Sequence, residues 1–162
     1  ELRFFLGYVP QPVIQELVAG PEITHDVVCD LRGELLAVVS RRRIEVRWGE
    51  VAKGVTVWDA GVAEQCGRVA RALEARGPIT VQCLMQGERA LFTEINARLG
   101  GGVPLGIAAG ADYPLWLLAR AAGLPIDIPP LGSYRQGLYL TRFDDAFYLD
   151  QEQYDRIDGC RL

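Results

Sequence analysis

The segment Leu91–Gly102 constrains the fold of this chain more than any other stretch. Its first eight residues alternate in character as a β-strand does, and successive side chains of a strand point to opposite faces. One face is expected to carry Phe92, Glu94, Asn96 and Arg98, and the other Leu91, Thr93 and Ile95. A carboxylate, an amide and a guanidinium therefore share a face, directly before three consecutive glycines.

These polar groups suit a metal ion bound together with phosphate. The side-chain oxygens of Glu94 and Asn96 are hard donors, and Mg²⁺ takes one or two carboxylates together with substrate phosphates. The planar guanidinium of Arg98 adds two-point recognition of a phosphate. The spacing alone is equally compatible with a solvent-exposed strand face that has no function, since one side of an antiparallel sheet often faces water.

Composition indicates one globular domain. The chain has 162 residues, of which 49% are hydrophobic and 23% charged, so a buried core is possible. The net charge of −4 and a single short basic cluster, Arg41–Arg43, do not support a nucleic acid or an anionic membrane as partner. No apolar run approaches the roughly 20 residues of a membrane helix, and Glu1–Arg3 does not begin a signal peptide. We therefore expect a cytoplasmic chain.

The cysteines and the single histidine do not indicate a metal site. Cys29, Cys66, Cys83 and Cys160 include no C-x-x-C pair, and three of them lie in apolar patterns. Buried free thiols are therefore expected rather than zinc ligands or disulfides. His25 lies in a strand-like run, where a structural role is expected.

The alternation and the turn residues predict an α+β fold with a mostly antiparallel sheet flanked by helices. Strands are expected over residues 2–8, 13–18, 22–30, 35–46, 79–85, 91–98, 137–143 and 147–149. Residues 1–150 are then expected to form one domain.

Two helices are expected between these strands. Asp59 and Asp112 are their N-cap candidates, and each helix ends at a glycine that is followed closely by proline. Arg142, on the last strands, is expected to pair with Asp144 or Asp145. The polar residues 151–162 are expected to form a tail that frays.

The order Glu-Ile-Asn-x-Arg over residues 94–98, followed by the glycine run, resembles the metal-binding strand of the ATP-grasp superfamily. The version that it resembles is found in carbamoyl-phosphate synthase large subunits and their smaller relatives. The resemblance covers about residues 13–149 and implies the C-terminal subdomain of an ATP-grasp catalytic unit. It implies that Glu94 and Asn96 bind Mg²⁺, or Mn²⁺ in its place, and that Arg98 is catalytic and stabilises developing charge.

The same resemblance makes Gln82 the third metal ligand. Residues directly opposite each other in a hairpin share a face, so Gln82 faces Glu94 only if the loop has an odd number of residues. A three-residue loop, Gly87–Arg89, satisfies this condition. Many relatives have an acidic residue at this position, so the neutral Gln82 is expected to be a weak ligand or an orienting group.

The resemblance also implies a nucleotide pocket before and within the first long strand. Glu16 and the backbone at Leu17 and Val18 face the adenine edge, and Glu22 reaches the ribose hydroxyls. A carboxylate that accepts from ribose hydroxyls is chemically reasonable. Either glutamate alone is better explained as a solvated strand residue, whereas the intact order of the motif favours the nucleotide pocket.

Alternation places Arg41, Arg43, Glu45 and Arg47 on one mostly charged strand face, which is either solvated or functional. In the functional alternative, which similar segments of close relatives suggest, Arg43 and Lys53 line a catalytic anionic site that receives the triphosphate or a substrate carboxylate. The glycine run lets backbone N–H groups approach an anion closely, and in the resemblance it borders the acyl-phosphate and the nucleophile.

The implied function is the C-terminal half of an ATP-dependent ligase. ATP phosphorylates a small carboxylate substrate, and an amine or another nucleophile then displaces phosphate. The glycine-rich loop and lysine of the N-terminal half have no counterpart here, so this half is expected in cis or in trans, and the isolated fragment is expected to be inactive.

Two other interpretations remain open. The chain is alternatively a non-catalytic binding or regulatory module derived from such an enzyme, or an unrelated α+β domain that contains the motif by coincidence. An exposed surface between the two halves would also favour a homo-oligomer.

Overall fold

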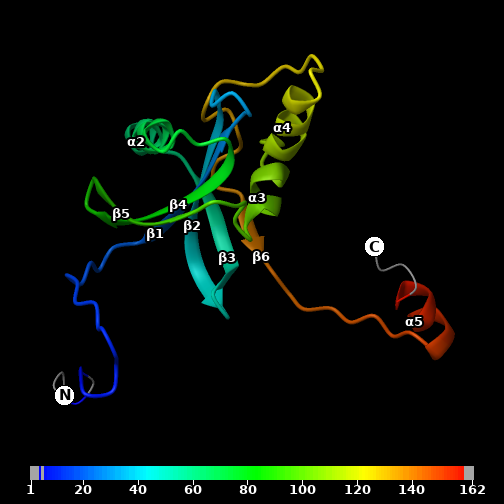
Figure 1. Ribbon diagram of the computed structural model, residues 1–162, viewed down its shortest axis with the longest axis horizontal. Coiled ribbons are helices and arrows are strands. Elements are labelled where there is room, and N and C mark those ends of the chain that lie inside the picture. Colours follow the sequence, from blue (N-terminus) through cyan, green and yellow to red (C-terminus); the bar gives the residue numbers. More distant parts are fainter. Residues whose placement is uncertain (1–3, 5, 159–162) are drawn as a thin grey trace.

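The computed structural model describes residues 4 and 6–158, and within them the core is an antiparallel sheet of six strands in the order β5-β4-β1-β2-β3-β6 (Figure 1). The strands are β1 (Glu22–Cys29), β2 (Leu35–Arg47), β3 (Glu50–Val57), β4 (Gly77–Gln86), β5 (Arg89–Asn96) and β6 (Tyr139–Thr141). The helices are α2 (Ala60–Ala72), α3 (Val103–Ala108), α4 (Tyr113–Ala121) and α5 (Gln151–Asp158). The predicted α+β class with an antiparallel sheet is confirmed.

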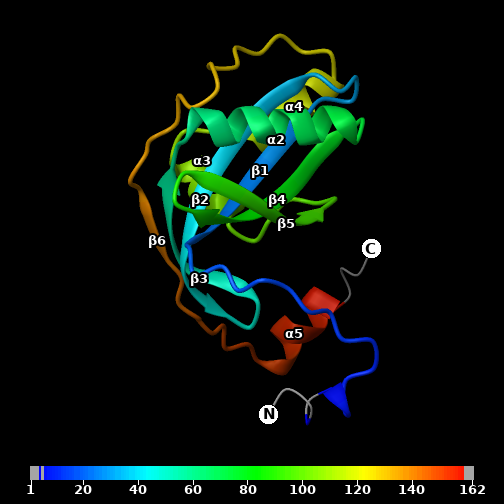
Figure 2. The same cartoon turned by 90° about the vertical axis from the view of Figure 1, so that its left-hand side faces the viewer.

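Helix α2 covers one face of the sheet (Figure 2). Asp59 caps the helix as predicted, because its carboxylate accepts a hydrogen bond from the Val62 backbone N–H at 2.9 Å. The buried side of α2, with Val62, Cys66 and Ala70, packs against the inward-facing residues of β1 and β4. This layer is the larger of two apolar cores.

Helices α3 and α4 lie on the opposite side of the sheet from α2 (Figure 1). Asp112 caps α4 as predicted, with its carboxylate accepting from the Leu115 N–H at 3.2 Å. The first residue of α4, Tyr113, is fully buried and packs with Val28 and Val39. The short helix α3 directly follows the glycine run.

The hairpin of β4 and β5 places Gln82 opposite Glu94, but by a route different from the one predicted. The turn has two residues, Gly87 and Glu88, so the predicted three-residue loop is wrong. The extra residue is instead Thr93, which forms a β-bulge within β5. The bulge shifts the register by one residue. It therefore has the same effect on the pairing of Gln82 with Glu94 as a turn with one more residue.

This bulge also turns Phe92 away from Glu94. Phe92 is paired with Cys83 and packs in the core beneath α2, so the prediction that it shares a face with Glu94 is wrong. Strict alternation holds only within an unbroken strand. Asn96, beyond the bulge, is paired with Thr80 and remains on the face of Glu94, as predicted.

Several predicted strands near the ends do not form. Residues 13–18 are coil and largely exposed, and no strand within residues 4 and 6–158 pairs with them. The predicted strand over residues 2–8 lies partly outside the described residues, and Phe4 and Leu6 have helical backbone. Residues 147–149 are exposed coil, and the strand expected over residues 137–143 is reduced to β6 (Tyr139–Thr141).

The tail is helical over Gln151–Asp158, where fraying was expected. Asp150 and Gln153 form a reciprocal capping box, with Asp150 Oδ1 accepting from the Gln153 N–H at 2.9 Å and Gln153 Oε1 from the Asp150 N–H at 3.0 Å. A salt bridge between Glu152 and Arg156 adds an i,i+4 contact. Helix α5 lies apart from the sheet at the end of an extended segment (Figure 1). Within the part of the chain that is described, no helix combines the length and the apolar character needed to cross a bilayer.

His25 is buried in β1 and has a structural environment. Its Nδ1 lies 2.8 Å from Ser40 Oγ and its Nε2 lies 3.3 Å from Cys83 Sγ. Burial, with a smaller contribution from Arg41, lowers the pKa of His25 from 6.5 to about 4. Cys83 is a buried free thiol, as are Cys29 and Cys66, whereas Cys160 lies outside the described residues.

The depressed pKa of His25 predicts that the fold loses stability in mild acid. The unfolded state binds the proton near pH 6.5 and the folded state near pH 4, so stability falls as pH decreases through this window. Between pH 7.5 and pH 5 this one group should lower the free energy of unfolding by about 2 kcal/mol. Urea denaturation at both pH values, on the parent and on His25→Gln, measures this effect. An equal pH-dependent loss in the two proteins would contradict it.

Candidate functional site

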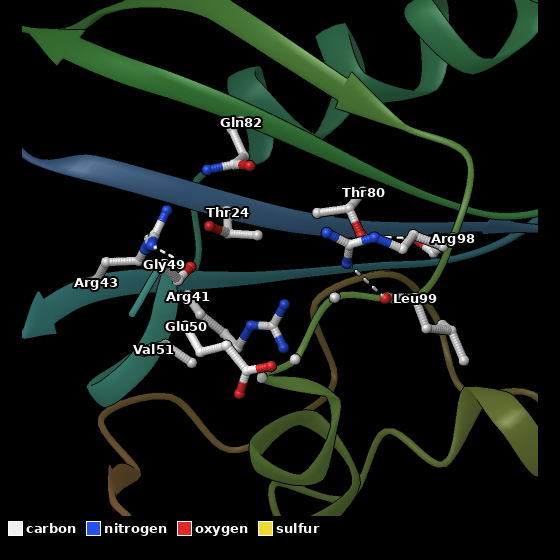
Figure 3. Close-up of a pocket in the computed structure, with 13 residues that line it drawn as sticks. Thr24, Arg41, Arg43, Gly49, Glu50, Val51, Thr80, Gln82, Arg98 and Leu99 are labelled. Carbon is white, nitrogen blue, oxygen red and sulfur yellow. Dashed lines mark hydrogen bonds between the residues drawn. The ribbon is translucent and has the colours of Figure 1, made fainter. Parts of the chain in front are cut away.

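An open cavity of about 340 Å³ lies on the face of the sheet that α2 does not cover (Figure 3). Its walls come from β1, β2, β4, the β2–β3 hairpin and the segment after β5. The lining residues are Thr24, Arg41, Arg43, Gly49, Glu50, Val51, Thr80, Gln82, Arg98, Leu99 and Gly100–Gly102. Three arginines and one glutamate therefore provide the charges of this cavity.

The register of the central strands brings the lining side chains together. Thr24 in β1 is paired with Arg41 on one side and with Gln82 on the other, so all three share a face. Thr80, two residues before Gln82, donates a hydrogen bond from Oγ1 to the Arg98 carbonyl at 2.7 Å. This bond anchors the segment after β5 to the sheet and places Arg98 at the cavity.

A buried charge network lies beneath the cavity. Arg41 Nη2 donates to Asp26 Oδ1 at 2.8 Å, and the Tyr113 hydroxyl donates to the other oxygen of the same carboxylate. The side chains of Arg41 and Asp26 are 4% and 0% exposed. Burial raises the pKa of Asp26, whereas Arg41 and the Tyr113 hydrogen bond oppose this shift. Burial also raises the pKa of Tyr113, so its hydroxyl stays a donor.

The sequence analysis assigned no site role to Asp26, Arg41 or Tyr113. The alternation of β1 places Asp26 on the same face as Thr24, which lines the cavity, and this alternation was the one signal in the sequence that could have pointed to Asp26. Its contact with Tyr113 spans 87 residues of the chain, and no local pattern indicates it.

A second polar cluster joins three residues that were predicted to bind ligands. Arg43 Nη1 donates to Glu22 Oε1 at 2.6 Å, and the Gln82 amide nitrogen donates to the same oxygen. Arg43 Nη2 also donates to the Gly49 carbonyl at 3.2 Å. Arg43 and Gln82 line the cavity, and Glu22 holds both of them at its edge.

Glu94 and Asn96 lie side by side on the exposed face of β5. Asn96 Nδ2 donates to Glu94 Oε1 at 2.7 Å, and both residues are outside the set that lines the cavity. Glu94 is directly opposite Gln82, so the three predicted metal ligands are brought together on one face.

The donor set of these three residues fits a magnesium ion that has few protein ligands. The amide nitrogens of Asn96 and Gln82 both donate to carboxylates, which leaves their oxygens as the atoms that can bind a cation. Glu94 supplies a negative charge, and phosphate oxygens would complete the coordination. Within residues 4 and 6–158, no three His, Cys, Asp or Glu side chains form a group suited to a metal ion, so a metal here depends on amide oxygens.

The structure does not bring the remaining predicted residues to the cavity. Lys53 lies on β3, where its Nζ pairs with Glu45 Oε2 at 2.6 Å. Glu16, Leu17 and Val18 belong to the coil before β1 and line no part of the cavity. Their proposed contacts with the triphosphate and with adenine stay predictions.

Arg142 pairs with Glu50 and not with Asp144 or Asp145 as predicted. Its backbone N–H donates to the Ala52 carbonyl at 2.9 Å, which continues the pairing along β3. Arg142 Nη1 consequently lies 2.5 Å from Glu50 Oε2, so the one carboxylate that lines the cavity already has a cationic partner.

Comparison with solved structures identifies the class of fold. The chain is similar to biotin carboxylase in its β,γ-ATP complex from Campylobacter jejuni, with 18% identity and a TM-score of 0.58, covering 77% of this chain and 30% of that one. It is also similar to the biotin carboxylase subunit of pyruvate carboxylase, with 19% identity and a TM-score of 0.58, covering 76% of this chain and 30% of that one. The chain thus spans about 30% of the length of these neighbours. No curated protein matches.

The chain thus shares the fold of part of biotin carboxylase. A family model described as ATP-grasp in the biosynthetic pathway with Ter operon matches residues 9–141, and the chain belongs to this family. The predicted membership of the ATP-grasp superfamily is confirmed. The closer likeness to carbamoyl-phosphate synthase stays a prediction.

The buried network predicts a stability effect for Tyr113. Tyr113→Phe removes one donor from the fully buried Asp26 carboxylate and should lower the free energy of unfolding by about 1–3 kcal/mol. Tyr139→Phe is the matched control, because Tyr139 is 68% exposed on β6. Denaturant unfolding of the three proteins measures the difference. Equal stability of Tyr113→Phe and the parent would show that Asp26 does not depend on this hydroxyl.

Proposed function

We propose that this chain forms the metal- and phosphate-binding wall of an ATP-dependent ligase that activates a carboxylate as an acyl-phosphate. The observation that carries the proposal is the common face of Gln82, Glu94 and Asn96 beside a cavity that contains Arg43 and Arg98. Oxygen donors next to guanidinium groups suit a magnesium-bound triphosphate. Family membership supports the same reaction class.

The chain's own residues have separable tasks in this reaction. Glu94 and Asn96, with Gln82 as a weaker third donor, would hold Mg²⁺ or Mn²⁺. A bound divalent ion supplies neutralisation of the β- and γ-phosphate charge. Arg98 lines the cavity, and in this proposal its guanidinium binds the transferred phosphoryl group and stabilises the negative charge that develops there.

The proposed reaction has two chemical steps, phosphoryl transfer to the substrate and displacement of phosphate by the nucleophile. A carboxylate oxygen of the substrate bonds to the γ-phosphorus while the bond to the ADP oxygen breaks. An amine or another nucleophile then attacks the acyl carbon, loses a proton, and displaces inorganic phosphate. Arg43 lines the cavity and adds a second positive charge for the triphosphate or the substrate carboxylate.

The nucleotide would extend from the cavity toward the start of β1. In this proposal the Glu22 carboxylate binds the ribose, and Glu16 with the backbone of Leu17 and Val18 binds adenine. Glu22 now accepts from Arg43 and Gln82, so it is held rigidly at the cavity edge. Lys53 would contribute a further cation. The N-terminal ATP-grasp half, in cis or in trans, would close over the nucleotide.

Calorimetry of ATP binding tests this proposal on the full chain. Binding should require Mg²⁺, and the double variant Glu94→Ala with Asn96→Ala should weaken it at least about tenfold, since hydrogen bonds and contacts to charged groups contribute roughly 1.5–3 kcal/mol each. Glu88→Ala, in the exposed β4–β5 turn, removes an equivalent carboxylate outside the site and should leave binding unchanged.

Two results would point elsewhere. ATP binding that is independent of Mg²⁺ and unaffected by the double variant would place the nucleotide outside this site. Binding as expected, but without turnover when the complementary half is supplied, would favour the non-catalytic binding module.

A further inference from the structure

Arg41 is a buried cation whose hydrogen bonds are incomplete. Its side chain is 4% exposed, and Nη2 donates to Asp26 at 2.8 Å. Among the described residues, Nη1 of the same guanidinium is buried and has no hydrogen-bond partner. A buried charged donor without an acceptor is costly, so this group is suited to an acceptor that the chain itself does not supply.

The glycine run packs directly against this guanidinium at the wall of the cavity. A Cβ atom at Gly102 would lie 2.7 Å from Arg41 Nη1, and one at Gly100 would lie 3.2 Å from Nη2. Larger residues at these positions would displace or cover the guanidinium. Arg41 consequently lines the cavity although almost all of its surface is buried.

Arg41 and Arg98 approach the cavity from different elements. Figure 3 shows their guanidinium groups extending into it from opposite sides, Arg41 from β2 and Arg98 from the segment after β5. The carboxylate that lines the same cavity, Glu50, is paired with Arg142. Arg41 and Arg98 therefore face one space, whereas the third arginine of the cavity, Arg43, donates to Glu22, and Glu50 is already paired with a cation.

We propose that Arg41 binds a second oxyanionic group of the acid substrate, so that the substrate class is a small dicarboxylic acid rather than a monocarboxylic one. This inference rests on the proposed function, in which Arg98 binds the phosphoryl group that is transferred to the substrate carboxylate. A monocarboxylate that is phosphorylated beside Arg98 leaves Arg41 Nη1 unpaired, whereas a second carboxylate accepts its hydrogen bond. Sites with such a buried donor discriminate strongly against ligands that lack the acceptor.

Binding of succinate and butyrate to the full chain, without nucleotide or metal, tests this assignment. Both acids have four carbons and differ in the second carboxylate. Succinate should bind at least about tenfold more tightly, because a hydrogen bond to a charged group contributes roughly 1.5–3 kcal/mol. Arg41→Lys, which keeps a charge beside Asp26, should remove this preference. Arg42→Lys is the matched control, since Arg42 is exposed and points to the other face of β2.

Gly102→Ala provides a second variant that changes no charge. Its added methyl group lies against Arg41 Nη1 and should also remove the succinate preference. Circular dichroism checks that each variant is folded. In the parent protein, the side-chain NMR signals of Arg41 should shift on addition of succinate but not of butyrate.

Three results would overturn the assignment. The first is equal affinity of the parent protein for the two acids. The second is a succinate preference that neither Arg41→Lys nor Gly102→Ala changes in folded protein. The third is an affinity for inorganic phosphate that depends on Arg41, together with an affinity for succinate that does not. The last result would place a nucleotide phosphate at Arg41. Failure of the ATP experiment would leave a succinate preference unchanged, so the failure of one proposal can be distinguished from the failure of the other.

Discussion

The buried ion pair of Arg41 and Asp26 is the interaction on which the site depends. Removing two charges from water is expensive, and the cost is offset only where hydrogen bonds are nearly complete. Asp26 meets this condition through Arg41 and through Tyr113, which connects β1 and β2 to the start of α4. The glycine run then packs against the pair, because only residues without a Cβ atom can approach it so closely. One polar contact thus joins the sheet, a helix and the cavity wall.

The bulge at Thr93 has a comparable effect at the edge of the sheet. A regular β5 that kept Glu94 opposite Gln82 would turn Phe92 out of the core beneath α2. One inserted residue allows Phe92 to remain packed while Glu94 and Asn96 face the open side. Core packing and the polar face are therefore both satisfied in a single short strand.

Of the residues that strand alternation and the family resemblance singled out, several on paired strands reach the site. Arg43 and Gln82 line the cavity, and Glu22 holds its edge, because β-alternation and register decide their direction. Arg98 lies beyond the end of β5, where the hydrogen bond from Thr80 to its carbonyl places it at the cavity. Alternation failed for the strand expected over residues 13–18, because no strand in the described part of the chain lies beside it to pair with. An isolated strand leaves its backbone groups unpaired, so propensity alone cannot maintain it.

The sequence by itself determined the α+β class, the capped helices at Asp59 and Asp112, and the order of polar residues over 94–98, because these follow from periodicity and local hydrogen bonds. Only the tertiary structure decided that Thr93 forms a bulge, that Arg142 pairs with Glu50, and that Arg41 lies beneath the glycine run. The contacts of Arg142 with Glu50 and of Arg41 with the glycine run join residues far apart in the chain. The bulge allows Phe92 to pack beneath α2. Such contacts depend on how whole elements pack, and local sequence does not encode that information.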